Sequence, residues 1–187
     1  MVKKLKILEL GAGANPYVTK KNETVIHVDI VKLPHIDLVY DLNKSPWPFK
    51  DNEFDKVIGC SILEHLDDVV KTINEIWRIT KNGGKVEILV PYFVCADSFT
   101  DPTHKHFFTT RSLDYWDKNT EIGKKLGFEM GHAQFKIKNK KILFGSKPLS
   151  KIKFLHALVN KHQHFYEVYA SRILPASAVY FELLTIK

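Results

Sequence analysis

Short apolar segments recur along the first half of the chain, each bounded by glycine, proline, asparagine or aspartate. Segments of this length and composition predict β-strands. They lie at residues 5–8, 24–29, 37–40, 56–60 and 85–91. Between the last two, apolar residues recur at helical spacing from Leu66 to Trp77, which predicts a helix ended by the glycines of 82–84. This alternation favours a parallel sheet sandwiched between helices, with ligands at the carboxyl ends of the strands.

The second half of the chain has a different pattern. Residues 92–110 are rich in aromatic residues, histidine and aspartate without a regular period, which predicts a loop over the strand ends. Helices are expected at 110–116, at 121–126 and within 151–174, and strands at 128–144 and 178–187. We see no linker, so we expect one domain over residues 1–187, with a cofactor-binding half (1–91) and a lid and acceptor half (92–187).

The connection after the first strand is unusual. Residues 14–19 contain Pro16 and leave little room for a full helix before the second strand. We therefore expect a short or irregular first crossover.

Composition narrows the class of protein. With 187 residues, 44% hydrophobic and 26% charged, the chain is typical of a soluble globular domain. Its apolar runs are strand-sized, so no membrane span is predicted, and the first of them ends at Gly11, too early for a signal peptide. The two cysteines, Cys60 and Cys95, indicate no disulfide framework. A cytoplasmic location is expected.

The net charge of +7 comes almost entirely from lysine. The densest stretch contains Lys136, Lys138, Lys140, Lys141, Lys147, Lys151 and Lys153. Partial alternation with apolar residues favours the solvated face of a strand. A surface that binds RNA or another polyanion is the alternative, and it would make the chain a non-catalytic binding module.

The chemistry is concentrated around the first two strands. Gly11-Ala12-Gly13 follows the first strand, and glycines there let the chain turn with positive φ and let a ligand approach the backbone. Asp29 ends the second strand, a position at which an acidic residue can accept hydrogen bonds from the hydroxyls of a ribose. A dinucleotide site would need a third glycine, but Pro16 occupies that position. The pattern therefore favours another nucleoside-type cofactor.

Further motifs follow in a fixed order. They are Asp41-Leu42, Pro46-Trp47-Pro48-Phe49, Phe54-Asp55, Leu63-Glu64-His65-Leu66 and Asn82-Gly83-Gly84. With the glycine turn, this series over residues 5–91 resembles the class I S-adenosylmethionine-dependent methyltransferases, in particular their small-molecule branch. The resemblance implies a Rossmann-like, doubly wound sheet of seven mostly parallel strands with an antiparallel last strand. It also implies S-adenosyl-L-methionine as cofactor, and methyl transfer to an oxygen or nitrogen of a small-molecule acceptor.

The resemblance also implies the cofactor contacts. They are Glu9, Gly11, Ala12, Gly13, Asp29, Ile30, Asp41, Leu42, Cys60 and Ser61. In such a site Asp29 would accept hydrogen bonds from both ribose hydroxyls, and Asp41 would accept one from the adenine amino group. Glu9 would hold the glycine turn, while Cys60 and Ser61 would line the methionine side.

Two histidines are candidates on the acceptor side. His65 follows Glu64 at the top of the fourth strand, where it lies near the methyl group or simply packs at the start of the helix. His104 lies in the run from Asp101 to Phe108, which resembles an acceptor-pocket loop of the same branch. It is our candidate base, because a neutral imidazole can take a proton near pH 7, and a base is needed only for a hydroxyl or a protonated amine. A purely structural loop is the second interpretation of this run, and a metal site built from Asp101, His104 and His106 is the third.

Overall fold

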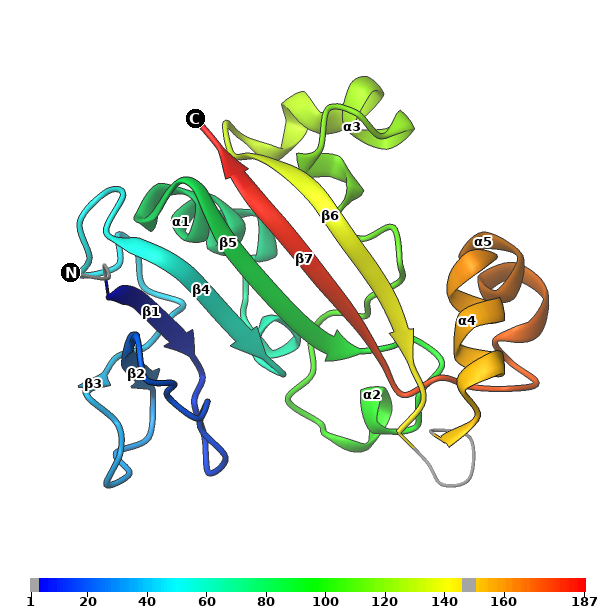
Figure 1. Ribbon diagram of the computed structural model, residues 1–187, viewed down its shortest axis with the longest axis horizontal. Coiled ribbons are helices and arrows are strands. Elements are labelled where there is room, and N and C mark those ends of the chain that lie inside the picture. The colour runs from blue at the N-terminus through cyan, green and yellow to red at the C-terminus, as the bar shows by residue number, and fades with distance from the viewer. Residues whose placement is uncertain (1–3, 146–150) are drawn as a thin grey trace.

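The computed structural model describes residues 4–145 and 151–187, and their strands form a single seven-stranded sheet (Figure 1). The strands are β1 (Leu5–Leu10), β2 (Glu23–Asp29), β3 (Leu38–Val39), β4 (Phe54–Cys60), β5 (Thr80–Pro91), β6 (Gln134–Leu143) and β7 (Ala178–Ile186). Their order across the sheet is β3-β2-β1-β4-β5-β7-β6. The first five are parallel, and β7 lies antiparallel between β5 and β6. This is the predicted Rossmann-like sheet, so the expected fold class is confirmed.

Helices are few and short. They are α1 (Val69–Ile79), α2 (Asp97–Thr100), α3 (Glu121–Leu126), α4 (Lys153–Lys161) and α5 (Gln163–Phe165). In the described part of the chain, 3₁₀ turns cover Leu63–His65, Asp114–Trp116 and Gly127–Met130, and a π-helical turn covers Tyr166–Ala170. No helix within residues 4–145 and 151–187 is long and apolar enough to cross a membrane.

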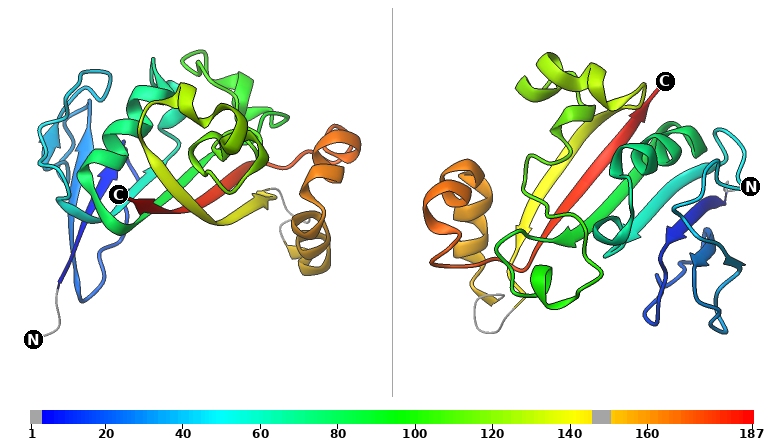
Figure 2. Two further views of the ribbon diagram at one scale, coloured as in Figure 1. Left: turned by 90° about the horizontal axis from the view of Figure 1, so that it is seen from above. Right: turned by 180° about the vertical axis from the view of Figure 1, so that it is seen from behind.

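The main core lies between one face of the sheet and α1. Val86 and Ile88 of β5 and Ile73 and Ile76 of α1 are all buried in it. Burying aliphatic side chains of this size contributes about 1.5–3 kcal/mol each relative to leaving them exposed. Seen from behind, α1 stands in front of the sheet (Figure 2).

The opposite face, which points toward the viewer in Figure 1, is crossed by no helix of the described residues. Charged side chains occupy its alternate positions instead. Glu87 pairs with Lys56 at 2.8 Å and with Lys85 at 2.9 Å, and Lys85 also contacts Glu182 at 3.2 Å. The side chains of β5 thus alternate: those that face α1 are apolar, and those that face water are largely charged.

The first crossover explains part of this asymmetry. Residues 11–22 contain no helix, as predicted from their length and from Pro16. The described helices therefore gather on the α1 side and at the β6 edge, where α4 contacts the sheet.

Helix α1 corrects one prediction. It begins after Asp68, whose carboxylate accepts the Lys71 N–H at 2.9 Å as an N-cap, and it ends at Ile79 rather than at the glycines. The chain becomes extended at Thr80, which already pairs with Phe54 of β4. Gly83 lies inside β5 with a φ of 70°. The glycines therefore serve the path of a strand and do not cap the helix.

Two further predictions were wrong in extent. The helix expected at 110–116 is reduced to the 3₁₀ turn Asp114–Trp116, where the buried Asp114 carboxylate pairs with Lys140 at 2.7 Å. The strand expected from residue 128 begins at Gln134, because Gly131 turns the chain with a φ of 82° after a second 3₁₀ turn. The helix expected at 121–126 is confirmed as α3.

Candidate active site

A cavity of about 510 Å³ opens at the carboxyl ends of β1, β2 and β4. It is lined by Gly11, Gly13, Asp29, Ile30, Tyr40, Asp41, Leu42, Asn43, Ser61, Ile62, His65, Leu66 and Thr103. Gly11 and Gly13 have φ values of 62° and 52°, which other residues adopt only at a cost. A Cβ atom on Gly11 would lie 2.7 Å from Cδ1 of Ile62. The glycine turn is therefore required both by its backbone conformation and by the close approach of Ile62.

Asp29 is fixed by the backbone around it. Its Oδ2 accepts the Gly13 N–H and its Oδ1 accepts the Val31 N–H, both at 2.9 Å. A carboxylate has about four lone-pair sites, so each oxygen keeps capacity for a further donor. The group can therefore hold the turn and a ligand's hydroxyls at once.

Glu9 lies behind the cavity and does not line it. Its two carboxylate oxygens accept the Tyr17 N–H at 2.9 Å, and Oε2 contacts Nδ1 of His27 at 2.6 Å. Glu9 thereby fastens the irregular segment that replaces a first helix. Ala12 also lies outside the cavity lining, being buried with its N–H bonded to Val28, and so does Cys60, whose residue is exposed.

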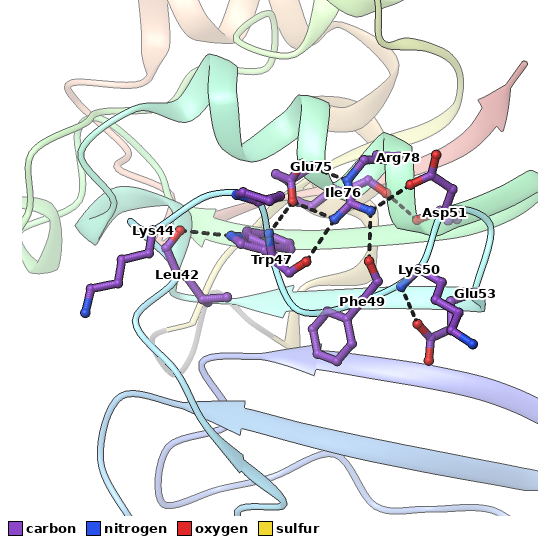
Figure 3. Close-up of polar contacts among 12 residues, drawn as sticks. Leu42, Lys44, Trp47, Phe49, Lys50, Asp51, Glu53, Glu75, Ile76 and Arg78 are labelled. Carbon is purple, nitrogen blue, oxygen red and sulfur yellow. Dashed lines mark hydrogen bonds and ion pairs between the residues drawn. The ribbon is translucent and has the colours of Figure 1, made fainter.

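The segment after Asp41 is anchored to α1 by a polar network (Figure 3). The Trp47 indole N–H donates to the Leu42 carbonyl at 3.0 Å, and the Trp47 backbone N–H donates to Glu75 at 2.6 Å. Glu75 in turn accepts Nε and Nη2 of Arg78, both at 2.8 Å. Burial alone would raise the pKa of Glu75, but the hydrogen bonds from Arg78 and Trp47 outweigh it and lower that pKa. The network fixes the cavity wall at Leu42.

A second cavity, of about 590 Å³, adjoins the first. It is lined by Ser61, Glu64, His65, Pro91, Asp97, Thr100, Asp101, Pro102 and His104. Ser61 and His65 line both cavities and so form a shared wall. Ser61 has a φ of 50°, a strained value for a non-glycine residue of the kind found at functional sites.

The loop that carries His104 is tied to the turn that carries His65. The N–H groups of Lys105 and His106 donate to the Glu64 carbonyl at 2.7 Å and 3.3 Å. His65 Nδ1 also contacts Oγ1 of Thr103 at 2.8 Å. These contacts bring the two histidines together, with ring centroids 4.6 Å apart.

Glu64 was not among the predicted site residues, although the Glu64-His65 pair was noted. Its residue is only 1% exposed, and burial raises the pKa of its carboxyl to about 7. Burial and the nearby His104 both lower the pKa of His65, which favours the neutral imidazole. Sequence spacing alone offered no signal that Glu64 points inward.

Residues 8–88 match a protein-family model described as a methyltransferase domain. Over 43 residues the chain is 51% identical to an uncharacterized protein of Methanocaldococcus jannaschii, a stretch that covers 23% of this chain and 19% of that protein. A SAM-dependent methyltransferase of Archaeoglobus fulgidus superposes with a TM-score of 0.59 at 17% identity, covering 97% of this chain and 86% of that one. The YcgJ protein of Bacillus subtilis gives a TM-score of 0.59 at 16% identity over 98% and 92% of the two chains. The structural likenesses show the fold, and the domain match covers its first half only, residues 8–88.

Residues 8–88 of this chain thus match a methyltransferase domain, and the fold as a whole is similar to that of SAM-dependent methyltransferases. The first cavity fits S-adenosylmethionine, the cofactor of such methyltransferases. Its volume lies in the ~300–1,000 Å³ range of ligand sites, and it places two carboxylates among apolar residues. Asp29 offers acceptors for ribose hydroxyls and Asp41 lies farther along the same cavity, while Ile62 and Leu66 offer apolar surface. Seven of the ten predicted contact residues line it: Gly11, Gly13, Asp29, Ile30, Asp41, Leu42 and Ser61.

The lysine-rich stretch is largely exposed, with one lysine paired. A β-bulge between Ile137 and Asn139 shifts the alternation of β6, and Lys140 pairs with Asp114. The other described lysines of the stretch are exposed: Lys136, Lys138, Lys141, Lys151 and Lys153. Lys147 lies outside the described residues. The polyanion alternative stays a prediction.

Proposed function

We propose that this methyltransferase transfers the methyl group of S-adenosylmethionine to an oxygen or nitrogen atom of a small-molecule acceptor. The observation that carries the proposal is the wall shared by the two cavities, Ser61 and His65. A donor in the first cavity and an acceptor in the second would meet across that wall. Orientation of this kind is the main requirement of a displacement reaction between two bound partners.

The cofactor supplies an activated methyl group on a sulfonium, which is a good leaving group. The protein then has to bind the cofactor and the acceptor, orient them, and remove a proton from the acceptor. Gly11, Gly13 and Asp29 would hold the cofactor, and the second cavity would hold the acceptor. Its volume of about 590 Å³ suits a small molecule.

His104 is the base that we propose for a hydroxyl or protonated amine. Its Nδ1 lies 3.0 Å from the Ser98 carbonyl, which can only accept a hydrogen bond. The proton therefore resides on Nδ1, and Nε2 keeps a free lone pair for the acceptor's proton. His65 is proposed as its neighbour at the shared wall.

The test is incubation with S-adenosylmethionine that carries a deuterated methyl group, together with hydroxyl and amine small molecules, followed by mass spectrometry. We expect labelled small molecules with the native protein and at least ~100-fold slower labelling with His104→Ala, a typical loss for general-base removal. His162→Ala, which changes an exposed histidine of the C-terminal helices, is the matched control. Label found in RNA and not in small molecules would overturn the proposed acceptor class.

A further inference from the structure

The Glu64 side chain is buried in a way that methyl transfer does not explain. Its residue is 1% exposed, and neither carboxylate oxygen has a hydrogen-bond partner among the described residues. Burying a carboxylate without a partner is costly, so such a group is normally paired or bound to a metal. Glu64 also lines the second cavity, so its unpaired carboxylate lies beside a space that can hold a ligand.

Two imidazoles complete a ligand set around Glu64. Glu64, His65 and His104 each offer one potential metal-ligand atom, and the three atoms lie within 4.8 Å of one another. Small side-chain rotations would bring them within the ~2.0–2.2 Å at which nitrogen and carboxylate ligands bind zinc. Of the predicted metal residues Asp101, His104 and His106, only His104 belongs to this group.

Hydrogen bonds define which nitrogen of each ring is free. The Ser98 carbonyl holds the His104 proton on Nδ1, which leaves Nε2 unprotonated. The Thr103 hydroxyl donates its single proton to Asp101 at 2.6 Å, so it must accept from Nδ1 of His65 at 2.8 Å. Nε2 of His65 is therefore unprotonated as well.

This is the arrangement typical of metal-binding histidines. Such residues donate their other ring N–H to a carbonyl, a carboxylate or another fixed acceptor, which orients the ring and sets its tautomer. Here both rings are oriented in that way by residues 98–103, whereas a histidine that only packs needs no such support. Asp101 acts through Thr103 and is a positioning residue.

We propose that Glu64, His65 and His104 bind one divalent transition-metal ion in the second cavity. Two imidazoles and one carboxylate are the ligand set of catalytic zinc sites and of non-haem Fe²⁺ sites, which keep open coordination positions. The second cavity leaves room at the ion for another ligand. This inference rests on the proposed function: if that function holds, the further ligand is an oxygen atom of the acceptor, and the acceptor class is a hydroxylated small molecule. With its Nε2 bound to the ion, His104 would not act as the base; the ion would instead lower the pKa of the bound hydroxyl, which would lose its proton to water.

The test is titration of the chelator-treated full chain with Co²⁺, followed by visible absorption, and then displacement of Co²⁺ by Zn²⁺. We expect one ion per chain. Glu64→Gln and His104→Ala should each weaken binding by at least ~100-fold, because loss of a supporting partner alone costs 10–100-fold. His162→Ala should bind as the native protein does.

Equal Co²⁺ affinity in the native protein and in both Glu64→Gln and His104→Ala would overturn the proposal. It would mean that Glu64 simply keeps a proton in its buried site. Titration of the same samples with S-adenosylhomocysteine separates the two proposals. A native protein that binds S-adenosylhomocysteine but no Co²⁺ would reject only the metal site. A native protein that binds Co²⁺ but no S-adenosylhomocysteine would reject only methyl transfer.

Discussion

The backbone N–H of Gly13 donates to the Asp29 carboxylate at 2.9 Å across 16 positions of sequence. The residue that we predict to hold the ribose thus also holds the glycine turn. If Asp29 binds the cofactor as predicted, cofactor binding and formation of the turn depend on the same charged group.

Replacement of Asp29 should therefore abolish more than one contact. Asp29→Ala removes acceptors for charge-assisted hydrogen bonds worth ~1.5–3 kcal/mol each, and it frees the turn. We expect S-adenosylhomocysteine affinity, measured by calorimetry, to fall by about 100-fold or more. Glu129→Ala, at an exposed position in the 3₁₀ turn after α3, should leave the affinity unchanged. Undiminished affinity in Asp29→Ala would place the cofactor elsewhere.

Gly11 and Gly83 offer a matched pair of substitutions. Both have positive φ, but a Cβ atom on Gly11 meets Ile62 at 2.7 Å, whereas one on Gly83 meets nothing within 4 Å. Gly83→Ala should cost only the backbone strain, about 1 kcal/mol of unfolding free energy. Gly11→Ala should cost more in urea unfolding and should also weaken S-adenosylhomocysteine binding. Equal effects of the two variants on both measurements would show that the contact with Ile62 is unimportant.

Features set by local geometry were predictable from the sequence. The glycine turn, the parallel strands and the irregular first crossover follow from periodicity, positive φ and the position of Pro16. The end of α1 was predicted wrongly, because Asn82-Gly83-Gly84 fits a helix cap as well as a turn within a strand. Pairing of Thr80 with Phe54 of β4 decided between them, and that contact is not local.

The contact between Glu64 and His104 also could not be predicted from the sequence, because it is not local. Glu64 and His104 meet only because the loop N–H groups of Lys105 and His106 bind the Glu64 carbonyl. The 39 residues between Glu64 and His104 include α1 and β5, and no pattern in one sequence encodes how the chain returns to bring the two side chains together. The structure places the two predicted histidines, His65 and His104, near each other, but the sequence did not predict the buried Glu64 carboxylate beside them.

Arg78 should be a major contributor to stability. Its removal leaves the Glu75 carboxylate buried without its charged partner, and breaking a buried pair in this way costs about 3–5 kcal/mol. Arg78→Ala should lose about 3 kcal/mol of unfolding free energy in urea. Asp51→Ala removes the exposed partner of the same guanidinium and should cost less than about 1 kcal/mol. The double variant Glu75→Gln with Arg78→Met removes both charges but keeps an acceptor for Trp47, and it should recover part of the loss.

The pH dependence of this effect has a defined sign. The folded-state pKa of Glu75 is lowered, so its stabilising contribution is full above the ordinary glutamate pKa of about 4.3 and is lost as pH falls through the lowered value. The difference in unfolding free energy between the native protein and Arg78→Ala should therefore be constant near neutrality and shrink below about pH 4. A difference that stays the same down to pH 2.5 would show that the pair does not carry the effect.

The wall formed by Ser61 and His65 restricts how this enzyme can change over evolution. In the proposed arrangement, a substitution at either position would alter the space for donor and acceptor together, so a gain in one would be tied to a loss in the other. Asp97, Thr100 and Pro102 line only the second cavity. New substrate preferences can thus arise along that short segment by ordinary point mutation, while the half of the site that every turnover shares is left untouched.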